Sequence, residues 1–334
     1  MFLALRLLVP MMLARARPAA LVVCCMVAAS GLGLPRPAWA ADPGGQPLSV
    51  FTTVVPLATF VERIGGDQVR VQALVRPGQN PHAYEPSPRQ IAALADADLY
   101  VRVGMSLEDA WLPRIRATNA RMRVLDARDN IRLRPSDVVQ TIDDSRGLAD
   151  HDHDGGAPDQ HQEPSHADHG HEALDTHVWT SPPLVKSMGA GIRDALIALR
   201  PEQADAFRAN YDRFAADLDA LDAAILARLA PVKERRFMVF HPAWGYYAET
   251  YGLTQVSVEY EGKEPGGRAL AGLIDAARAN AVTVVLVQPQ FSPRAAEQIA
   301  AAIGGRVESV DPLAADYFAT LRRLTDLIAG PATP

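Results

Sequence analysis

Strand and helix patterns alternate twice along this chain, before and after one long helical stripe. The segments TTVVPLATFVERIGGDQVRVQALV and VFHPAWGYYAETYGLTQVSVEY both read as strand, short helix, glycine and strand. Runs such as VTVVLV are apolar throughout, as expected for strands that helices cover on both faces. The sequence therefore predicts an α/β fold with two lobes, each with a mostly parallel four-stranded sheet and flanking helices.

The same patterns give approximate bounds for the elements. Strands are expected near residues 48–54, 69–75, 98–103 and 123–126 in the first half, and near 237–241, 254–259, 282–287 and 306–310 in the second. The expected helices include 58–64, 88–95, 245–251, 269–280 and 293–303. Gly65-Gly66 suits the C-terminal end of the first of them.

One helical stripe joins the two halves. Between residues 201 and 229, apolar side chains recur every three or four positions, at Phe207, Tyr211, Phe214, Leu218, Leu221, Ile225 and Leu229. Pro201 suits the start of a helix and Pro231 its end. A helix of this length spans roughly 40 Å and would act as a stiff strut that permits only small rocking of the lobes. The alternative is an ordinary packed helix of one domain.

Residues 1–40 are expected to be a signal peptide. They contain four arginines and no acidic residue, and an apolar run precedes the small-x-small cleavage signal Ala38-Trp39-Ala40. The apolar run is broken by glycines and falls short of the roughly 18 residues that a membrane span needs, which disfavours a membrane anchor. We expect secretion with cleavage after Ala40.

Cleavage would change the charge and the metal-binding options of the chain. Loss of four arginines takes the formal net charge from −6 to −10, which argues against nucleic acid as a partner. Both cysteines, Cys24 and Cys25, lie in the removed segment. The mature chain could then form no disulfide and no thiolate site, so a tight metal site must use imidazole and carboxylate.

The nine histidines form two groups. Residues 150–172 are rich in His, Asp, Gly and Pro, predict a mobile loop, and contain His151, His153, His161, His166, His169 and His171. Three roles are open for this His-rich tract. It would bind zinc weakly and deliver it, sense metal, or serve only as a solubilising linker. The other three histidines, His82, His177 and His241, lie far apart in NPHAYEPSP, DTHVW and FHPAWGYY.

We expect the three dispersed histidines to meet at one metal ion between the halves. Ligands bind beyond the carboxyl ends of strands in open α/β sheets, and His241 ends the expected strand 237–241 while His82 follows strand 69–75. Asp311 ends the strand ESVD and is the candidate carboxylate. Three imidazoles and one carboxylate make a tetrahedral zinc set with a net charge of about +1. Alternatively, each would be an ordinary loop histidine or helix-capping aspartate.

Several segments resemble zinc-binding, ZnuA-like members of the periplasmic solute-binding proteins that feed metal-uptake ABC transporters. The resemblance covers about residues 48–330 and is carried by NPHAYEPSP, DLYVRVGMSLEDAW, DTHVW, the long helix, FHPAWGYYAETYGL, VEYEGKEP, VQPQFSPRAAEQIA and VDPLAADYF. It implies two lobes joined by a rigid helix, with metal held by His82, His177, His241 and Asp311. Manganese-type members have a glutamate at the third position, so His241 favours zinc, in line with ligand softness.

The chain departs from the family pattern at one motif. The family motif Asp-Pro-His reads Asp175-Thr176-His177 here. Some relatives use water or a glutamate as the fourth ligand, which leaves water as the alternative to Asp311. Glu264, in EGKEP, is a family signature to which the spacing assigns no role.

The resulting prediction is a monomeric periplasmic protein that binds Zn²⁺ with high affinity and delivers it to the membrane permease of an ABC importer. Residues 41–200 would form the N-terminal lobe, 201–230 the linking helix and 231–334 the C-terminal lobe. No enzyme is expected, because the chain lacks an HExxH-type motif. The alternatives are a manganese or iron carrier of the same fold, a zinc-dependent hydrolase, and an adhesin built on the same scaffold.

Overall fold

The computed structural model describes residues 46–136, 174–232, 236–259 and 263–330. They belong to one compact unit of the chain, residues 44–334. The predicted signal peptide and the predicted His-rich tract lie outside the described residues. Among the residues that the structure describes, none of the helices combines the length and the hydropathy of a membrane-spanning segment.

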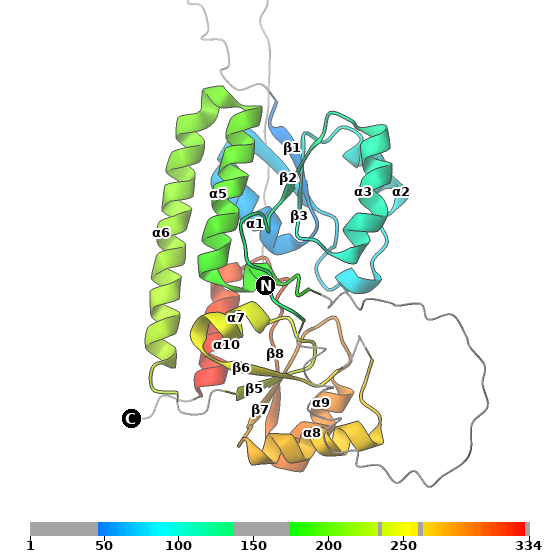
Figure 1. Ribbon diagram of the computed structural model, residues 1–334, viewed down its shortest axis with the longest axis vertical. Helices are drawn as coiled ribbons and strands as arrows, with labels where there is room; N and C mark the ends of the chain where they lie inside the picture. The colour runs from blue at the N-terminus through cyan, green and yellow to red at the C-terminus, as the bar shows by residue number, and fades with distance from the viewer. Residues whose placement is uncertain (1–45, 137–173, 233–235, 260–262, 331–334) are drawn as a thin grey trace, which may run out of the picture. The chain divides into compact units, whose positions relative to one another are not determined.

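The first lobe is built on a four-stranded parallel sheet (Figure 1). Its strands are β1 (Leu48–Thr52), β2 (Val69–Ala73), β3 (Leu99–Arg102) and β4 (Arg123–Asp126), in the order β2-β1-β3-β4. The helices that connect them are α1 (Val55–Gly65), α2 (Pro88–Leu94) and α3 (Ser106–Thr118).

Helices cover both faces of this sheet, which explains the apolar side chains on both faces of its two central strands. Val50 and Leu99 belong to the core that α1 and α5 (Pro182–Leu199) share. Their chain neighbours Phe51 and Tyr100 belong to a second core with α2 and α3. Successive side chains of a strand point to opposite faces, so β1 and β3 each contribute apolar side chains to both cores.

The second lobe repeats the first in its topology. Its strands are β5 (Arg236–Val239), β6 (Thr254–Ser257), β7 (Val284–Val287) and β8 (Arg306–Ser309), all parallel and in the order β6-β5-β7-β8. The connecting helices are α7 (Gly245–Tyr251), α8 (Gly267–Ala279) and α9 (Arg294–Ile303). The predicted α/β fold with two similar four-stranded sheets is confirmed. Strand β5 ends at Val239, two residues earlier than predicted.

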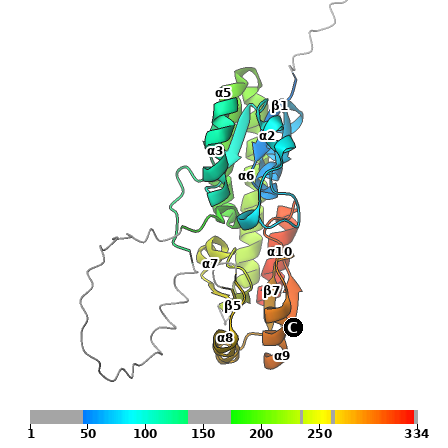
Figure 2. The same ribbon diagram turned by 90° about the vertical axis from the view of Figure 1, so that its right-hand side faces the viewer.

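The predicted joining helix is also present, as α6 (Ala204–Leu229). It begins three residues later than predicted, because residues Pro201–Gln203 form a 3₁₀ turn, a common start for an α-helix. Figures 1 and 2 show α6 beside α5 and running past both sheets. The predicted apolar stripe is buried along α6 except for Tyr211, which is partly buried.

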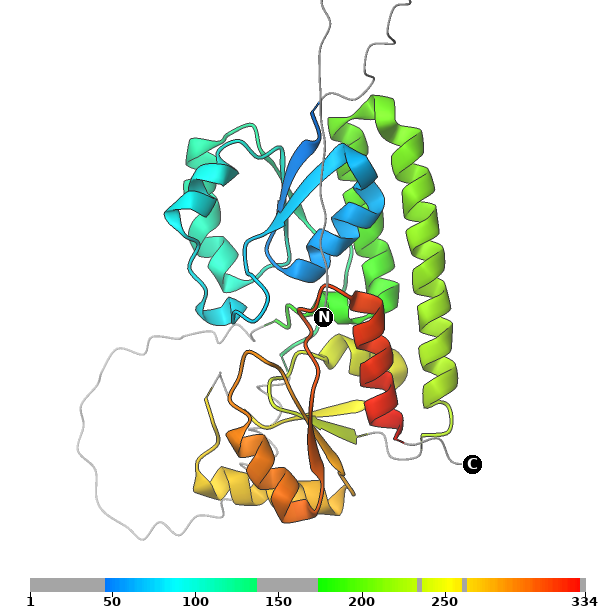
Figure 3. The ribbon, with the colours of Figure 1, turned by 180° about the vertical axis from the view of Figure 1, so that it is seen from behind.

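Helix α6 packs against elements from both ends of the chain. It contacts α1 and α5, and also α10 (Tyr317–Ala329), the last helix (Figure 3). The ring of Phe60 in α1 lies 5.6 Å from that of Phe214 in α6 and 5.0 Å from that of Tyr317 in α10, measured between centroids. Such aromatic pairs pack tightly, so α6 is anchored to α1 and α10 rather than to a single neighbour.

Candidate metal centre

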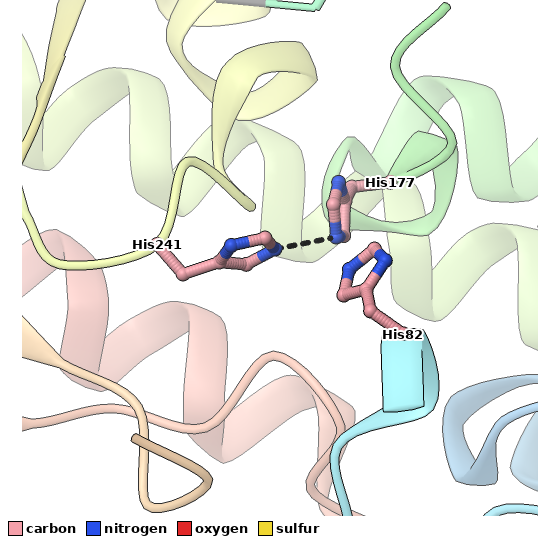
Figure 4. A group of neighbouring side chains, drawn as sticks. All are labelled: His82, His177 and His241. Atoms are coloured by element: carbon pink, nitrogen blue, oxygen red, sulfur yellow. Dashed lines mark hydrogen bonds between the residues drawn. The ribbon is translucent and has the colours of Figure 1, made fainter. Parts of the chain in front are cut away.

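The structure brings His82, His177 and His241 together (Figure 4). One ring nitrogen of each lies within 4.8 Å of the others, and no other group of three or more metal-binding side chains exists among the described residues. The Nε2 atoms of His177 and His241 are 3.3 Å apart. Two of these histidines precede α6 in the chain and the third follows β5, as the sequence predicts. A divalent ion could bind between them.

His82 lies in the loop between β2 and α2, in the 3₁₀ turn η2 (Pro81–Ala83). The Asn80 side chain accepts a hydrogen bond of 2.9 Å from the backbone N–H of His82 and so caps the turn. Pro81 fixes its own φ angle immediately before the histidine. The turn therefore has little freedom, although His82 is the most exposed of the three histidines.

A buried aspartate holds His177. The Oδ1 atom of Asp175 accepts the backbone N–H of His177 at 2.9 Å and lies 2.8 Å from the ring Nδ1. Its Oδ2 atom is 3.1 Å from Nη1 of Arg134. Burial by itself would raise the pKa of Asp175, but hydrogen bonds from His177 and the charge of Arg134 outweigh burial and lower it. Asp175 is therefore an acceptor that orients the ring of His177.

A buried glutamate holds His241 in the same way. The Oε1 atom of Glu259, just beyond β6, lies 2.5 Å from Nδ1 of His241. The Gln288 side chain accepts the backbone N–H of His241 at 3.1 Å and donates to its carbonyl oxygen at 2.6 Å. Phe291 stacks on the ring at 5.0 Å between centroids. The position and orientation of His241 are thus fixed from several sides.

These contacts leave the Nε2 atoms of His177 and His241 free to face an ion. A carboxylate that accepts the Nδ1 hydrogen fixes the tautomer in which Nε2 carries the lone pair. It also makes the ring more basic and so a stronger metal ligand. The pKa of His82 is lowered to about 3, mainly because the ring loses its hydration and also because it lies near His177 and His241. Burial likewise lowers the pKa of His241. Both shifts favour the neutral ring, which is the form that binds metal.

The space enclosed by the histidines is small. A cavity of about 20 Å³ is lined by Asn80, Pro81, His82, His177, His241, Gln288, Gln290, Phe291, Pro312 and Leu313. This volume holds about one water-sized particle. The cavity therefore has room for a single ion among the three histidines.

Asp311 does not belong to the group of three histidines. Its Oδ1 atom accepts hydrogen bonds of 2.9 Å from the side chain of Gln290 and from the backbone N–H of Leu313, both of which line the cavity. Asp311 therefore lies next to the cavity, and its role as a fourth ligand stays a prediction. The six tract histidines lie outside the described residues, and Glu264 is exposed.

Asp175 and Glu259 were not predicted from the sequence as partners of the histidines. Asp175 lies two residues before His177 in the DTHVW motif, and this two-residue spacing, typical of an Asx turn, was the available signal. Glu259 ends the expected strand 254–259, so the rule on carboxyl ends that selected His241 applied to it as well.

Comparisons with known proteins agree with this geometry. A family model described as zinc-uptake complex component A, periplasmic (ZnuA) matches residues 50–330. The zinc-binding lipoprotein AdcA of Streptococcus pneumoniae is 29% identical over 270 residues, which cover 80% of this chain and 50% of that protein. The high-affinity zinc uptake system protein ZnuA of Bacillus subtilis is 27% identical over 295 residues, with 87% and 86% covered. The chain thus spans about half the length of AdcA.

Solved structures show the same likeness. The chain in a crystal structure of ZnuA is 36% identical to this one, with a TM-score of 0.72. The match covers 85% of this chain and 98% of the ZnuA chain. A ZnuA deletion mutant with zinc bound is also 36% identical, with a TM-score of 0.71 and coverage of 86% and 100%. The family consists of metal-binding solute-binding proteins rather than enzymes, in agreement with the sequence prediction. With this fold, and with a family match over residues 50–330, the chain belongs to the ZnuA family.

Proposed function

We propose that the protein captures Zn²⁺ at His82, His177 and His241 and delivers it to the membrane permease of an ABC-type importer. The observation that carries the proposal is the convergence of three ring nitrogens within 4.8 Å, two of the rings being held at Nδ1 by buried carboxylates. Imidazole nitrogens are preferred zinc ligands, and a three-histidine set leaves one position for a fourth donor. The names of the relatives, zinc-binding protein and zinc uptake system protein, support the same cargo.

The metal preference follows from the donors. Manganese prefers carboxylate and carbonyl oxygens, whereas the three side chains that converge here offer nitrogen. We therefore expect the purified protein to retain Zn²⁺ when a large excess of Mn²⁺ or Fe²⁺ is added. Equilibrium dialysis followed by elemental analysis of the protein fraction would measure this. Displacement of zinc by manganese at comparable free concentrations would instead favour the manganese or iron carrier.

The location and the remaining details of the proposal come from the sequence. Cleavage after Ala40 would release a periplasmic protein, and we propose that it acts as a monomer without nucleic-acid partners. We also propose Asp311 as the fourth zinc ligand, with a water molecule as the alternative. Its position beside Gln290 and Leu313, which line the cavity, supports this choice. We propose the same domain bounds as in the sequence analysis: residues 41–200 for the N-terminal lobe, 201–230 for the linking helix and 231–334 for the C-terminal lobe.

The proposed role of the His-rich tract gives a separate prediction. A variant that lacks residues 150–172 should keep one tightly bound zinc ion, because none of the three clustered histidines lies in the tract. The total zinc bound per chain should fall, because six imidazoles are removed. Calorimetric titration of both proteins would measure the two classes of site. X-ray absorption on the tract-deleted protein should show three imidazole nitrogens at about 2.0 Å.

Two results would contradict this division of roles. Loss of the tight zinc ion in the tract-deleted protein would mean that the tract supplies ligands to the main site. An unchanged total stoichiometry would mean that the tract binds no zinc and serves only as a linker.

A further inference from the structure

The two carboxylates that hold His177 and His241 differ in how their charge is balanced. Asp175 has Arg134 at 3.1 Å, and Arg134 in turn lies 3.3 Å from Glu249. Among the described residues, Glu259 has no lysine or arginine within ion-pair distance, and its only ion-pair contact is the ring of His241. The Glu259 Oε2 atom is buried and has no hydrogen-bond partner there.

Burial makes this difference important. Asp175 and Glu259 are 4% and 3% exposed, so water screens neither charge. A buried carboxylate destabilises a fold unless a cation and hydrogen bonds compensate for the lost hydration. Arg134 supplies that compensation to Asp175. No such side chain compensates for the charge of Glu259 among the described residues. A metal ion bound at Nε2 of His241, on the far side of the ring, would supply the missing positive charge.

We propose that Glu259 is a positioning residue for zinc whose buried charge is balanced by the bound ion. It would increase zinc affinity by orienting His241 and by adding negative charge, and it would do so at the expense of the stability of the metal-free protein. Asp175 would orient His177 without this destabilisation, because Arg134 balances it. The inference rests on the proposed zinc site. It adds that the two supporting carboxylates differ in which cation balances their charge.

A pair of isosteric variants tests the proposal. Glu259→Gln keeps an oxygen that accepts the Nδ1 hydrogen of His241 but removes the charge. Zinc affinity should fall by about 10–100-fold, as is typical when the outer partner of a ligating histidine is changed. The metal-free variant should be at least as stable as the wild-type protein, because a buried uncompensated charge has been removed.

Asp175→Asn is the matched comparison. It should also lower zinc affinity by about 10–100-fold. Unlike Glu259→Gln, it should destabilise the metal-free protein, because the largely buried Arg134 loses its buried partner. Competition with a fluorescent zinc chelator would give the affinities, and urea unfolding of the metal-free proteins would give the stabilities. ¹⁵N chemical shifts of the His241 ring should show that Glu259→Gln keeps the Nδ1–H tautomer, so that its lower affinity reflects the lost charge.

The outcomes separate this inference from the proposed function. If the wild-type protein binds zinc tightly but Glu259→Gln has the same affinity, or is less stable than the wild-type protein without metal, the inference is wrong and the zinc site stands. A Glu259→Gln variant that fails to fold without zinc would equally overturn it. If the wild-type protein holds no zinc at the three histidines, the proposed function itself fails.

Discussion

His241→Ala is expected to abolish high-affinity zinc binding. His241 is the only one of the three clustered histidines that the second lobe supplies, and its Nε2 lies 3.3 Å from that of His177. Its removal leaves two imidazoles and also leaves the buried carboxylate of Glu259 without its partner. The loss of affinity should therefore exceed the roughly 100-fold upper range for changes in outer partners of a ligand.

Chelator competition on metal-free protein would measure this change. The matched control is His161→Ala, which removes an imidazole from the His-rich tract and should leave the tight site unchanged. Circular dichroism should show that both variants keep the wild-type secondary structure. A wild-type dissociation constant in His241→Ala would mean that zinc does not bind between these three side chains.

Glu108→Ala is expected to destabilise the first lobe strongly. Glu108 is 1% exposed and lies in the first turn of α3. Its two oxygens accept hydrogen bonds from the hydroxyl of Thr53, from Nε of Arg102 and from the backbone N–H groups of Val103, Gly104 and Met105. Removing one partner of a buried charge pair typically costs about 3–5 kcal/mol, and the backbone donors would also lose their acceptor.

Asp109→Ala is the matched control for this prediction. Asp109 is the next residue in α3 and lies 2.7 Å from the same guanidinium, but its side chain is 68% exposed. Exposed ion pairs contribute about 0–1 kcal/mol, so this variant should stay within about 1 kcal/mol of the wild-type protein. Urea denaturation of the metal-free proteins would measure both free energies of unfolding. Equal effects in the two variants would show that the hydrogen bonds of Glu108 carry little of the stability of this lobe.

The fold could largely be predicted from the sequence, because its signals are local. Helices cover the sheets, so a strand such as β7 (VVLV) is apolar throughout, and the spacing of apolar side chains in α6 follows the helical period. The same local signals did not give the strand ends. Phe240 continues the apolar run beyond Val239, where β5 ends, because burial outside a sheet selects the same residue types as burial within it.

The candidate site was predicted only in part. Prolines, aromatic residues and strand ends frame His82, His177 and His241 and mark them as candidates in the sequence, and the three side chains do lie together in the fold. Asp311 met the same criterion of a strand end, yet its Oδ1 atom is engaged by Gln290 and Leu313. A position at the end of a strand predicts the edge of the sheet at which a side chain lies. Its hydrogen-bond partners depend on how the neighbouring loops pack.

By itself, then, the sequence determined the two α/β lobes and the joining helix, and it singled out the three histidines that cluster in the fold. Only the tertiary structure decided that Glu259 supports His241 and that Arg134 pairs with Asp175. Glu259 meets His241 across 18 residues because β6 lies beside β5 in the sheet, and Asp175 meets Arg134 across 41 residues. Periodicity and turn chemistry act over a few neighbouring residues, while such long-range contacts exist only after the sheets have formed and packed.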